Sequence, residues 1–121
     1  MVSSSVKKDL LIEALSYIKR FRDRIIVIKY GGAAMIEKNL KQSFAEDIVL
    51  LQSLGMKPVI VHGGGPEVSK AMEQLGQQVQ FVEGLRVTSA ENLKVTEMVL
   101  SGTINKEIIA HLNTCGGKAV G

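Results

Sequence analysis

Cysteine, tryptophan and the other aromatic residues are scarce in this sequence, and each scarcity excludes a class of protein. Cys115 is the only cysteine among 121 residues, so no disulfide can form within the chain. A chain without disulfides fits a reducing compartment. Tryptophan is absent and aromatic residues make up 4% of the sequence, which leaves few rings on which nucleic-acid bases could stack. A nucleic-acid partner is therefore not expected.

The sequence also has no large excess of charge of one sign and no long apolar run. Fifteen basic residues stand against 12 acidic ones, and the net charge of +3 is spread along the chain rather than gathered in a basic stripe. No apolar run approaches the ~18 residues that a membrane span requires. Asp9 and Glu13 lie within the first apolar segment, where a signal peptide would be uniformly apolar. We expect a cytoplasmic protein with no membrane partner.

Hydrophobic periodicity predicts a helical extension and then an alternation of strands and helices. Apolar residues recur at helical spacing from Val6 to Phe21, which predicts an amphipathic helix within an extension of residues 1–21. Its apolar stripe must pack either on its own domain or on another subunit. The next elements are a strand over 24–30, a helix over 39–54, a strand that opens at Pro58 and a helix from Pro66 to Leu75. This order is typical of a parallel sheet with helices on its faces.

The second half of the chain predicts a hairpin and further helices. Residues 79–87 alternate enough for a short hairpin or an extended excursion, and Thr88 and Glu91 have capping-box spacing ahead of a helix. Gly102 is expected to separate that helix from another over 103–114, after which residues 118–121 look like the start of a third strand. Residues 22–121 then form one lobe. A sheet that stops as a strand begins indicates the amino-terminal part of something longer.

Two of the predicted strands end abruptly in glycines. The first breaks at Gly31 and Gly32, and the second at Gly63, Gly64 and Gly65, directly before a predicted helix. Glycines at the carboxyl end of a strand let backbone N–H groups approach a phosphate or carboxylate, and the start of a helix adds its positive end. A plain turn would use fewer glycines. These five residues therefore predict anion-binding loops.

Two basic residues accompany the glycine loops. Lys29 interrupts an apolar strand near its carboxyl end, where open α/β sheets place ligands, and a buried lysine there would need an anionic partner. A solvent-exposed lysine is the alternative. Arg86 lies in an extended segment where its guanidinium suits a carboxylate, although a surface salt bridge with Glu83 or Glu91 fits the spacing equally well. Together the loops and cations indicate an enzyme that handles two anions.

Other catalytic constellations are missing from the sequence. There is no metal-ligand cluster, no Ser-His-Asp arrangement and no phosphate-binding loop of the lysine-serine type. A carboxylate with a pKa near ~4.3 is already a nucleophile at neutral pH and needs no general base. Phosphoryl transfer to a carboxylate then depends on positioning and charge neutralisation, which glycine-rich backbone donors and a lysine can supply. No metal ligand is assigned.

Four motifs together resemble the acetylglutamate kinases of the amino-acid kinase family. They are Lys29-Tyr30-Gly31-Gly32-Ala33-Ala34-Met35, His62-Gly63-Gly64-Gly65-Pro66, Gly84-Leu85-Arg86-Val87-Thr88 and Gly102-Thr103-Ile104-Asn105-Lys106. The resemblance covers nearly the whole chain from Lys7 onward. It implies a three-layer α/β/α fold with a mainly parallel sheet, of which this chain is the amino-terminal, acetylglutamate-binding lobe. Family members are longer and their carboxyl half supplies the nucleotide pocket, so the 121-residue chain alone is expected to be inactive.

The activity that the resemblance implies is ATP-dependent phosphorylation of the γ-carboxylate of N-acetyl-L-glutamate, a step of arginine biosynthesis. By that similarity the catalytic residue is Lys29, the substrate-binding residues are Gly64, Gly65 and Arg86, and the phosphate-loop residues are Gly31, Gly32 and Gly63. Mg²⁺ would enter with ATP, mostly outside this chain. The leading helix resembles the arginine-inhibited branch, in which such a helix joins dimers into a hexamer. A homo-oligomer and arginine feedback inhibition are implied.

Two other functions stay open on the sequence. The first is a kinase for a related acylated amino acid, such as an aminoadipate derivative, and turnover of the two substrates side by side distinguishes it. The second is a non-catalytic module that binds an acyl-amino acid or arginine and acts through oligomerisation. The length of the polypeptide in its native cell separates that module from the kinase.

Overall fold

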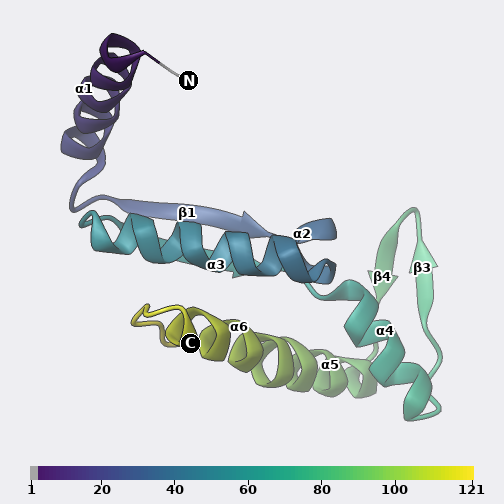
Figure 1. The fold of residues 1–121 in the computed structure, drawn as a ribbon. Coiled ribbons are helices and arrows are strands. Elements are labelled where there is room, and N and C mark those ends of the chain that lie inside the picture. The colour runs from purple at the N-terminus through teal and green to yellow at the C-terminus, as the bar shows by residue number, and fades with distance from the viewer. Residues whose placement is uncertain (1–2) are drawn as a thin grey trace.

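The computed structural model describes residues 3–121 of the chain. In chain order its elements are α1 (Ser4–Phe21), β1 (Ile25–Tyr30), α2 (Ala33–Ile36), α3 (Lys38–Ser53), β2 (Lys57–His62), α4 (Gly65–Gln74), β3 (Gln80–Val82), β4 (Leu85–Val87), α5 (Ala90–Glu97), the π-helix η1 (Met98–Ile104) and α6 (Asn105–Thr114). Figure 1 shows α1 standing apart from the rest, and the β3–β4 hairpin beside α4 at the opposite end. The strands and the longer helices lie between them.

The strands β1 and β2 pair in parallel, in register from Ile25 with Lys57 to Tyr30 with His62. The helix α3 makes the crossover between them, as the predicted strand–helix–strand order requires. Parallel strands end at the same edge of a sheet, so the glycine loops that follow Tyr30 and His62 are neighbours. The strands β3 and β4 form the predicted antiparallel hairpin. The mixed α/β class, the parallel sheet and the amino-terminal helix are confirmed.

Three small clusters of buried side chains join these elements. They consist of Tyr30, Met35 and Ile104; of Ala45, Ile48 and Leu112; and of Val68, Met72 and Val95. Ile60 of β2 packs on the first two clusters, which places α3 and α6 side by side against one face of the sheet. The third cluster joins α4 to α5. Full burial of each large apolar side chain contributes about 1.5–3 kcal/mol.

The other face of the β1–β2 sheet is exposed in the described residues. Ile25 and Val27 are 70% and 67% exposed, and the strand register sets Val59 beside Val27 on the same face. Val61 continues this apolar surface. Residues 3–121 therefore contain the sheet and one of the two helical layers that a three-layer fold requires.

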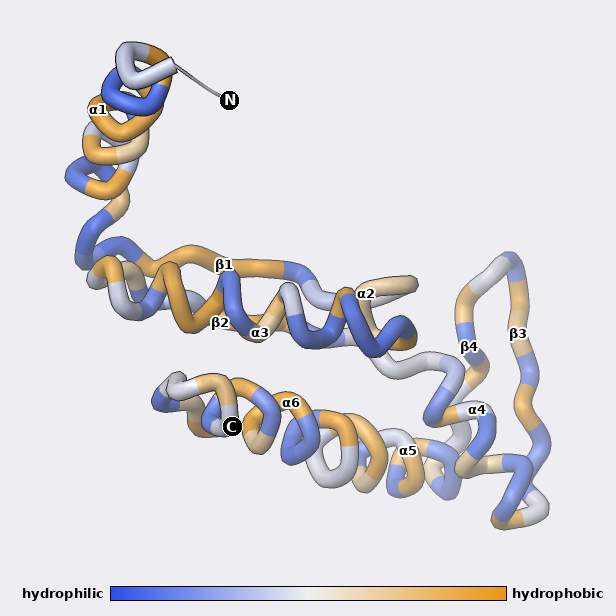
Figure 2. Tube along the Cα trace, viewed as in Figure 1, coloured by the Kyte–Doolittle hydropathy of each residue, from blue (hydrophilic) through white to orange (hydrophobic). Residues whose placement is uncertain are grey.

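The helix α1 has no buried residue. The hydroxyl of Ser3 caps its first turn by accepting a hydrogen bond from the Val6 N–H at 3.4 Å, and Lys19 and Arg20 lie favourably in its last turn. Most of its apolar side chains, among them Leu11 and Leu15, are exposed, and Ile18 is half-buried. Figure 2 shows these apolar residues on a helix that stands away from the remaining chain. The helix does not pack on its own sheet, and a contact with another subunit stays a prediction.

The expected break at Gly102 is wrong. The chain stays helical from α5 through η1 to α6, and Gly102 lies inside the π-helical segment. A glycine inside a helix costs about 1 kcal/mol relative to alanine, which packing can override. Val95 and Ile104 are both 4% exposed and belong to different clusters, so buried contacts hold the helix on either side of the glycine. The π-helix accommodates the change in spacing between them.

The expected third strand at residues 118–121 is also wrong. The Lys118 N–H donates to Gln52 Oε1 at 3.0 Å, and the Ala119 N–H donates to Asn113 Oδ1 at 2.8 Å. Side chains of α3 and α6 therefore take the backbone donors that a neighbouring strand would otherwise pair. The short helix α2 was not predicted, because four residues are too few to show a helical period.

Candidate functional site

The two glycine loops contact each other at the carboxyl ends of β1 and β2. The Gly63 N–H donates to the carbonyl oxygen of Tyr30 at 2.8 Å, so the parallel pairing continues into the second loop. A Cβ placed on Gly63 would lie 4.0 Å from the Cα of Gly31. The ring Nδ1 of His62 lies 2.8 Å from the Gly63 carbonyl oxygen, which fixes the imidazole by a structural hydrogen bond. The structure thus brings together the loops that the sequence predicted separately.

The glycines of these loops fall into two physical classes. Gly64 has a φ of +152°, and a Cβ there would overlap the side chain of Ile104 and lie 2.8 Å from Leu100 Cδ2. This glycine allows the long helical run to approach the loop. In contrast, Gly31, Gly32 and Gly65 have no other heavy atom within 4 Å of the Cβ position. The backbone beside these three glycines is open to a ligand.

The helix α4 presents its amino terminus at this same edge. Gly64 is its N-cap and no side chain caps it, while the Val68 N–H closes the first turn on the Gly64 carbonyl oxygen at 3.0 Å. The first N–H groups of a helix have no partner within it, and they carry the positive end of the helix dipole. The N–H groups of Gly65 and Glu67 are therefore suited to an anion.

Lys29 lies on the exposed face of β1, on the side opposite to Tyr30. Its side chain forms no hydrogen bond and no ion pair within residues 3–121. The prediction of an anionic partner assumed that the lysine is buried. Because its side chain is exposed, burial does not require such a partner. The lysine stands next to the buried residue from which the first glycine loop departs, and the register sets it opposite Val61.

The guanidinium of Arg86 reaches the start of α4 rather than a neighbouring carboxylate. Its Nη2 donates to the Gly65 carbonyl oxygen at 2.9 Å and to Ser69 Oγ at 2.6 Å. Its Nη1 lies 3.5 Å from Met72 Sδ, and its Cζ lies 4.8 Å from the centroid of the Phe81 ring. Arg86 therefore does not make the salt bridge with an acidic neighbour that the spacing also allowed. Arg86 and the second glycine loop belong to one site.

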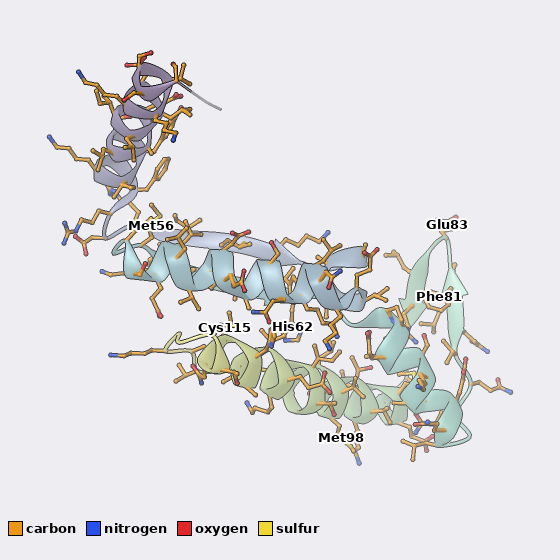
Figure 3. All side chains as sticks on the ribbon, in the orientation of Figure 1. Met56, His62, Phe81, Glu83, Met98 and Cys115 are labelled. Atoms are coloured by element: carbon orange, nitrogen blue, oxygen red, sulfur yellow. The ribbon has the colours of Figure 1, made fainter. Side chains whose placement is uncertain are left out.

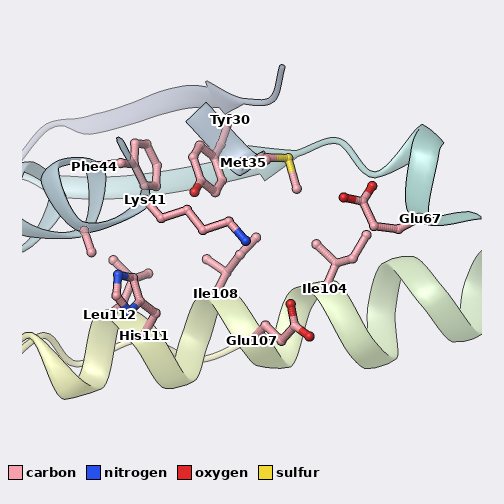
Figure 4. A pocket seen from close by; sticks show the side chains of 11 residues that line it. Tyr30, Met35, Lys41, Phe44, Glu67, Ile104, Glu107, Ile108, His111 and Leu112 are labelled. Carbon is pink, nitrogen blue, oxygen red and sulfur yellow. The ribbon is translucent and has the colours of Figure 1, made fainter. Parts of the chain in front are cut away.

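A cavity of about 230 Å³ opens behind the first loop, between α3 and α6 (Figure 4). Tyr30 lines it, stacked on Phe44 with ring centroids 3.8 Å apart, and donates its hydroxyl to the Ala34 carbonyl oxygen at 2.9 Å. Burial raises the pKa of Tyr30 above its usual 10.0. Lys41 and His111 also line the cavity, and the Nε2 of His111 is buried without a partner in the described residues.

Sequence reasoning missed several residues of this region. Ser69 and Phe81 contact Arg86, although they lie 17 and five residues before it in the sequence. No sequence motif links them to it. Ile104 and Leu100 contact Gly64 from a distant helix. The only local signal was the predicted hairpin, in which Phe81 pairs opposite Arg86.

Residues 3–121 do not gather three or more His, Cys, Asp or Glu side chains that could hold a metal ion. No helix among these residues has both the length and the apolar character needed to cross a bilayer.

Comparison with known proteins places this arrangement in a family. The model of the amino acid kinase family matches residues 24–121. The chain belongs to this family. An acetylglutamate kinase of Azoarcus sp. (strain BH72) is 53% identical over 120 residues, which are 99% of the chain and 40% of that relative. The chain thus spans less than half the length of this curated relative.

Two solved structures of a related fold carry ligands. N-acetylglutamate synthase from Neisseria gonorrhoeae, complexed with coenzyme A and N-acetyl-glutamate, matches with a TM-score of 0.70 and 27% identity, covering 91% of this chain and 26% of the synthase chain. The same enzyme complexed with coenzyme A and L-arginine matches with a TM-score of 0.66 and 29% identity, covering 89% and 24%. These likenesses agree with the family assignment.

Proposed function

We propose that this chain forms the acetylglutamate-binding part of an ATP-dependent acetylglutamate kinase. The enzyme would transfer the terminal phosphoryl group of ATP to the γ-carboxylate of N-acetyl-L-glutamate. The observation that carries the proposal is the joining of three anion-binding features at one sheet edge: two contacting glycine loops, the amino terminus of α4, and Arg86. The 53% identity to an acetylglutamate kinase supports this substrate.

The proposed chemistry assigns one role to each feature. The γ-carboxylate is ionised at neutral pH and would attack the terminal phosphorus of ATP without a general base, so that the new O–P bond of the acyl phosphate forms as the bond to the leaving ADP oxygen breaks. Backbone N–H groups of Gly31, Gly32 and Gly65 would stabilise charge on the transferring group, and Lys29 would supply a positive charge to it. Arg86 would hold the α-carboxylate, which does not react. Donors fixed before the reaction stabilise the developing charge with little reorganisation.

The nucleotide and its metal ion need residues beyond those assigned here. ATP is the phosphoryl donor expected of a kinase, and Mg²⁺ would accompany it. Residues 3–121 gather no ligand cluster that fits a metal ion. The proposal assigns the acceptor substrate to this chain.

The test is turnover by the full-length protein that carries this sequence. Acyl phosphate formed from ATP and acetylglutamate is trapped with hydroxylamine as a hydroxamate, and N-acetyl-aminoadipate is assayed beside it. Preference for acetylglutamate supports the proposal, while preference for aminoadipate indicates the related kinase. If neither substrate turns over, the non-catalytic arginine-binding module is favoured, to which the likeness to an L-arginine complex lends support.

We further propose that α1 joins copies of this protein. Its apolar stripe is exposed at Leu10, Leu11 and Leu15, and Ile18 near its end is half-buried. An amphipathic helix with an unburied stripe gains stability by covering it. A homo-oligomer, either a dimer or a hexamer built through this helix, would provide that cover.

A further inference from the structure

The hairpin that carries Arg86 has little packing of its own. Every residue of β3 is exposed, and Leu85 and Val87 of β4 are exposed as well. Arg86 is the half-buried residue of its strand. In Figure 3 the hairpin extends from the Phe81 region to its tip at Glu83, away from the main helices. The direction of the Arg86 guanidinium therefore depends on the particular groups that it contacts.

Ser69, Met72 and Phe81 supply the side-chain contacts of the guanidinium, and the contact with Ser69 Oγ is the shortest of them. Both N–H groups of Arg86 Nη2 are used, one on the Gly65 carbonyl oxygen at 2.9 Å and one on Ser69 Oγ at 2.6 Å. Phe81, opposite Arg86 in the hairpin, lies under the guanidinium face at 4.8 Å. A guanidinium has five N–H donors, so the Nε–H and one N–H of Nη1 stay available, and each can donate one hydrogen bond to a carboxylate oxygen.

The hydroxyl of Ser69 differs from several other helical hydroxyls of this chain. Ser53, Thr96 and Thr114 each donate to a carbonyl oxygen of the preceding turn, at 2.7–2.8 Å. That local bond is the usual choice for serine and threonine inside helices. Ser69 instead accepts from a residue 17 positions away, on another element. Its hydroxyl serves a contact between α4 and the hairpin.

We propose that Ser69 is a positioning residue, whose hydroxyl orients the Arg86 guanidinium so that the remaining N–H groups meet the α-carboxylate of the acceptor substrate. Phe81 supports the same orientation by holding the guanidinium plane. The inference rests on the proposed function, since it names how that substrate is held. Ser69 does not contact the reacting atoms in this scheme.

The experiment compares Ser69→Ala, Ser69→Thr and the control Ser53→Ala in the full-length protein. Two acceptors are used: acetylglutamate and 4-acetamidobutyrate, which has the same γ-carboxylate but no α-carboxylate. We expect Ser69→Ala to raise the KM for acetylglutamate about tenfold, as loss of a hydrogen bond to a charged group implies. The kcat and the KM for ATP should stay within about twofold.

The second acceptor separates positioning from a general structural effect. With 4-acetamidobutyrate, Ser69→Ala and the unaltered protein should have equal KM values, because Arg86 then has no carboxylate to hold. Ser69→Thr keeps the hydroxyl and should restore the KM for acetylglutamate, and Ser53→Ala should leave it unchanged. An unchanged KM in Ser69→Ala, or an equal rise for both acceptors, would overturn the positioning role alone. Absence of turnover by the unaltered protein would instead overturn the proposed function on which it rests.

Discussion

Replacing Gly64 with alanine should destabilise the protein far more than the same replacement at Gly65. The two glycines are adjacent and lie at the start of one helix. Gly64 has a φ of +152°, which side chains rarely adopt, and an added Cβ would overlap Ile104 Cδ1 and approach Leu100 Cδ2 to 2.8 Å. At Gly65 no other heavy atom lies within 4 Å of that position and φ is not positive. The pair forms a matched comparison.

Two effects set the size of the loss at Gly64. Inserting a methyl group into a packed contact costs about 1–3 kcal/mol. Holding a residue with a side chain in a rare backbone region costs about 1–3 kcal/mol more. We expect Gly64→Ala to lower the free energy of unfolding by roughly 2–6 kcal/mol. Gly65→Ala should change it by less than about 1 kcal/mol, since alanine suits a helix.

Urea unfolding followed by circular dichroism measures both losses. Ile104→Val removes Cδ1, the atom that the new methyl group would overlap, and alone should cost about 0.5–1.5 kcal/mol. In that background the loss from Gly64→Ala should shrink by about 1 kcal/mol, a coupling of the size seen between residues in contact. Equal stabilities of the two alanine variants, or purely additive losses in the double variant, would refute the reasoning.

Four further outcomes are expected. Lys29→Ala should lower kcat about 10²–10³-fold with little change in the KM for acetylglutamate, measured by steady-state kinetics. Arg86→Ala should raise that KM about 10–100-fold, and an unchanged KM would remove the carboxylate assignment. Deleting residues 1–20 should reduce the oligomer mass measured by light scattering, and an equal mass would exclude α1 as the subunit contact. Burial raises the pKa of Tyr30, so above pH 10.0 the unfolded state releases a proton that the native state keeps. The contribution of Tyr30 to the free energy of unfolding should be fully present below pH 10.0 and should fall above it. Tyr30→Phe should weaken that fall.

Most of the secondary structure was predictable because its signals are local. Alternation and helical spacing predicted β1, β2, α3 and the hairpin, and glycines marked where the strands end. The errors came from contacts between distant residues. Gly102 has a local preference to end a helix, but Val95 and Ile104 are anchored in two separate clusters. The predicted strand at residues 118–121 does not form, because the side chains of Gln52 and Asn113 accept hydrogen bonds from its backbone N–H groups.

The candidate site was predictable in composition and only partly in geometry. Strand ends that break into glycines indicated both loops, and their contact followed from the parallel pairing. Two features have no sequence signal. The helix that touches Gly64 begins more than 20 residues later in the chain, and the acceptor for Arg86 lies on α4. Exposure of Lys29 was the alternative rather than the favoured interpretation, because neighbouring apolar residues suggested burial, while half of that strand faces outward.

The exposed face of the β1–β2 sheet also affects how molecules of the chain associate with one another in solution. Parallel strands are normally covered on both faces, and here β-branched side chains such as Ile25, Val27 and Val59 meet solvent. Molecules of the 121-residue chain should adhere through this face increasingly as they are concentrated. Such non-specific aggregates dissociate on dilution, whereas a specific oligomer formed through α1 keeps a defined number of subunits. A dilution series therefore resolves the two surfaces.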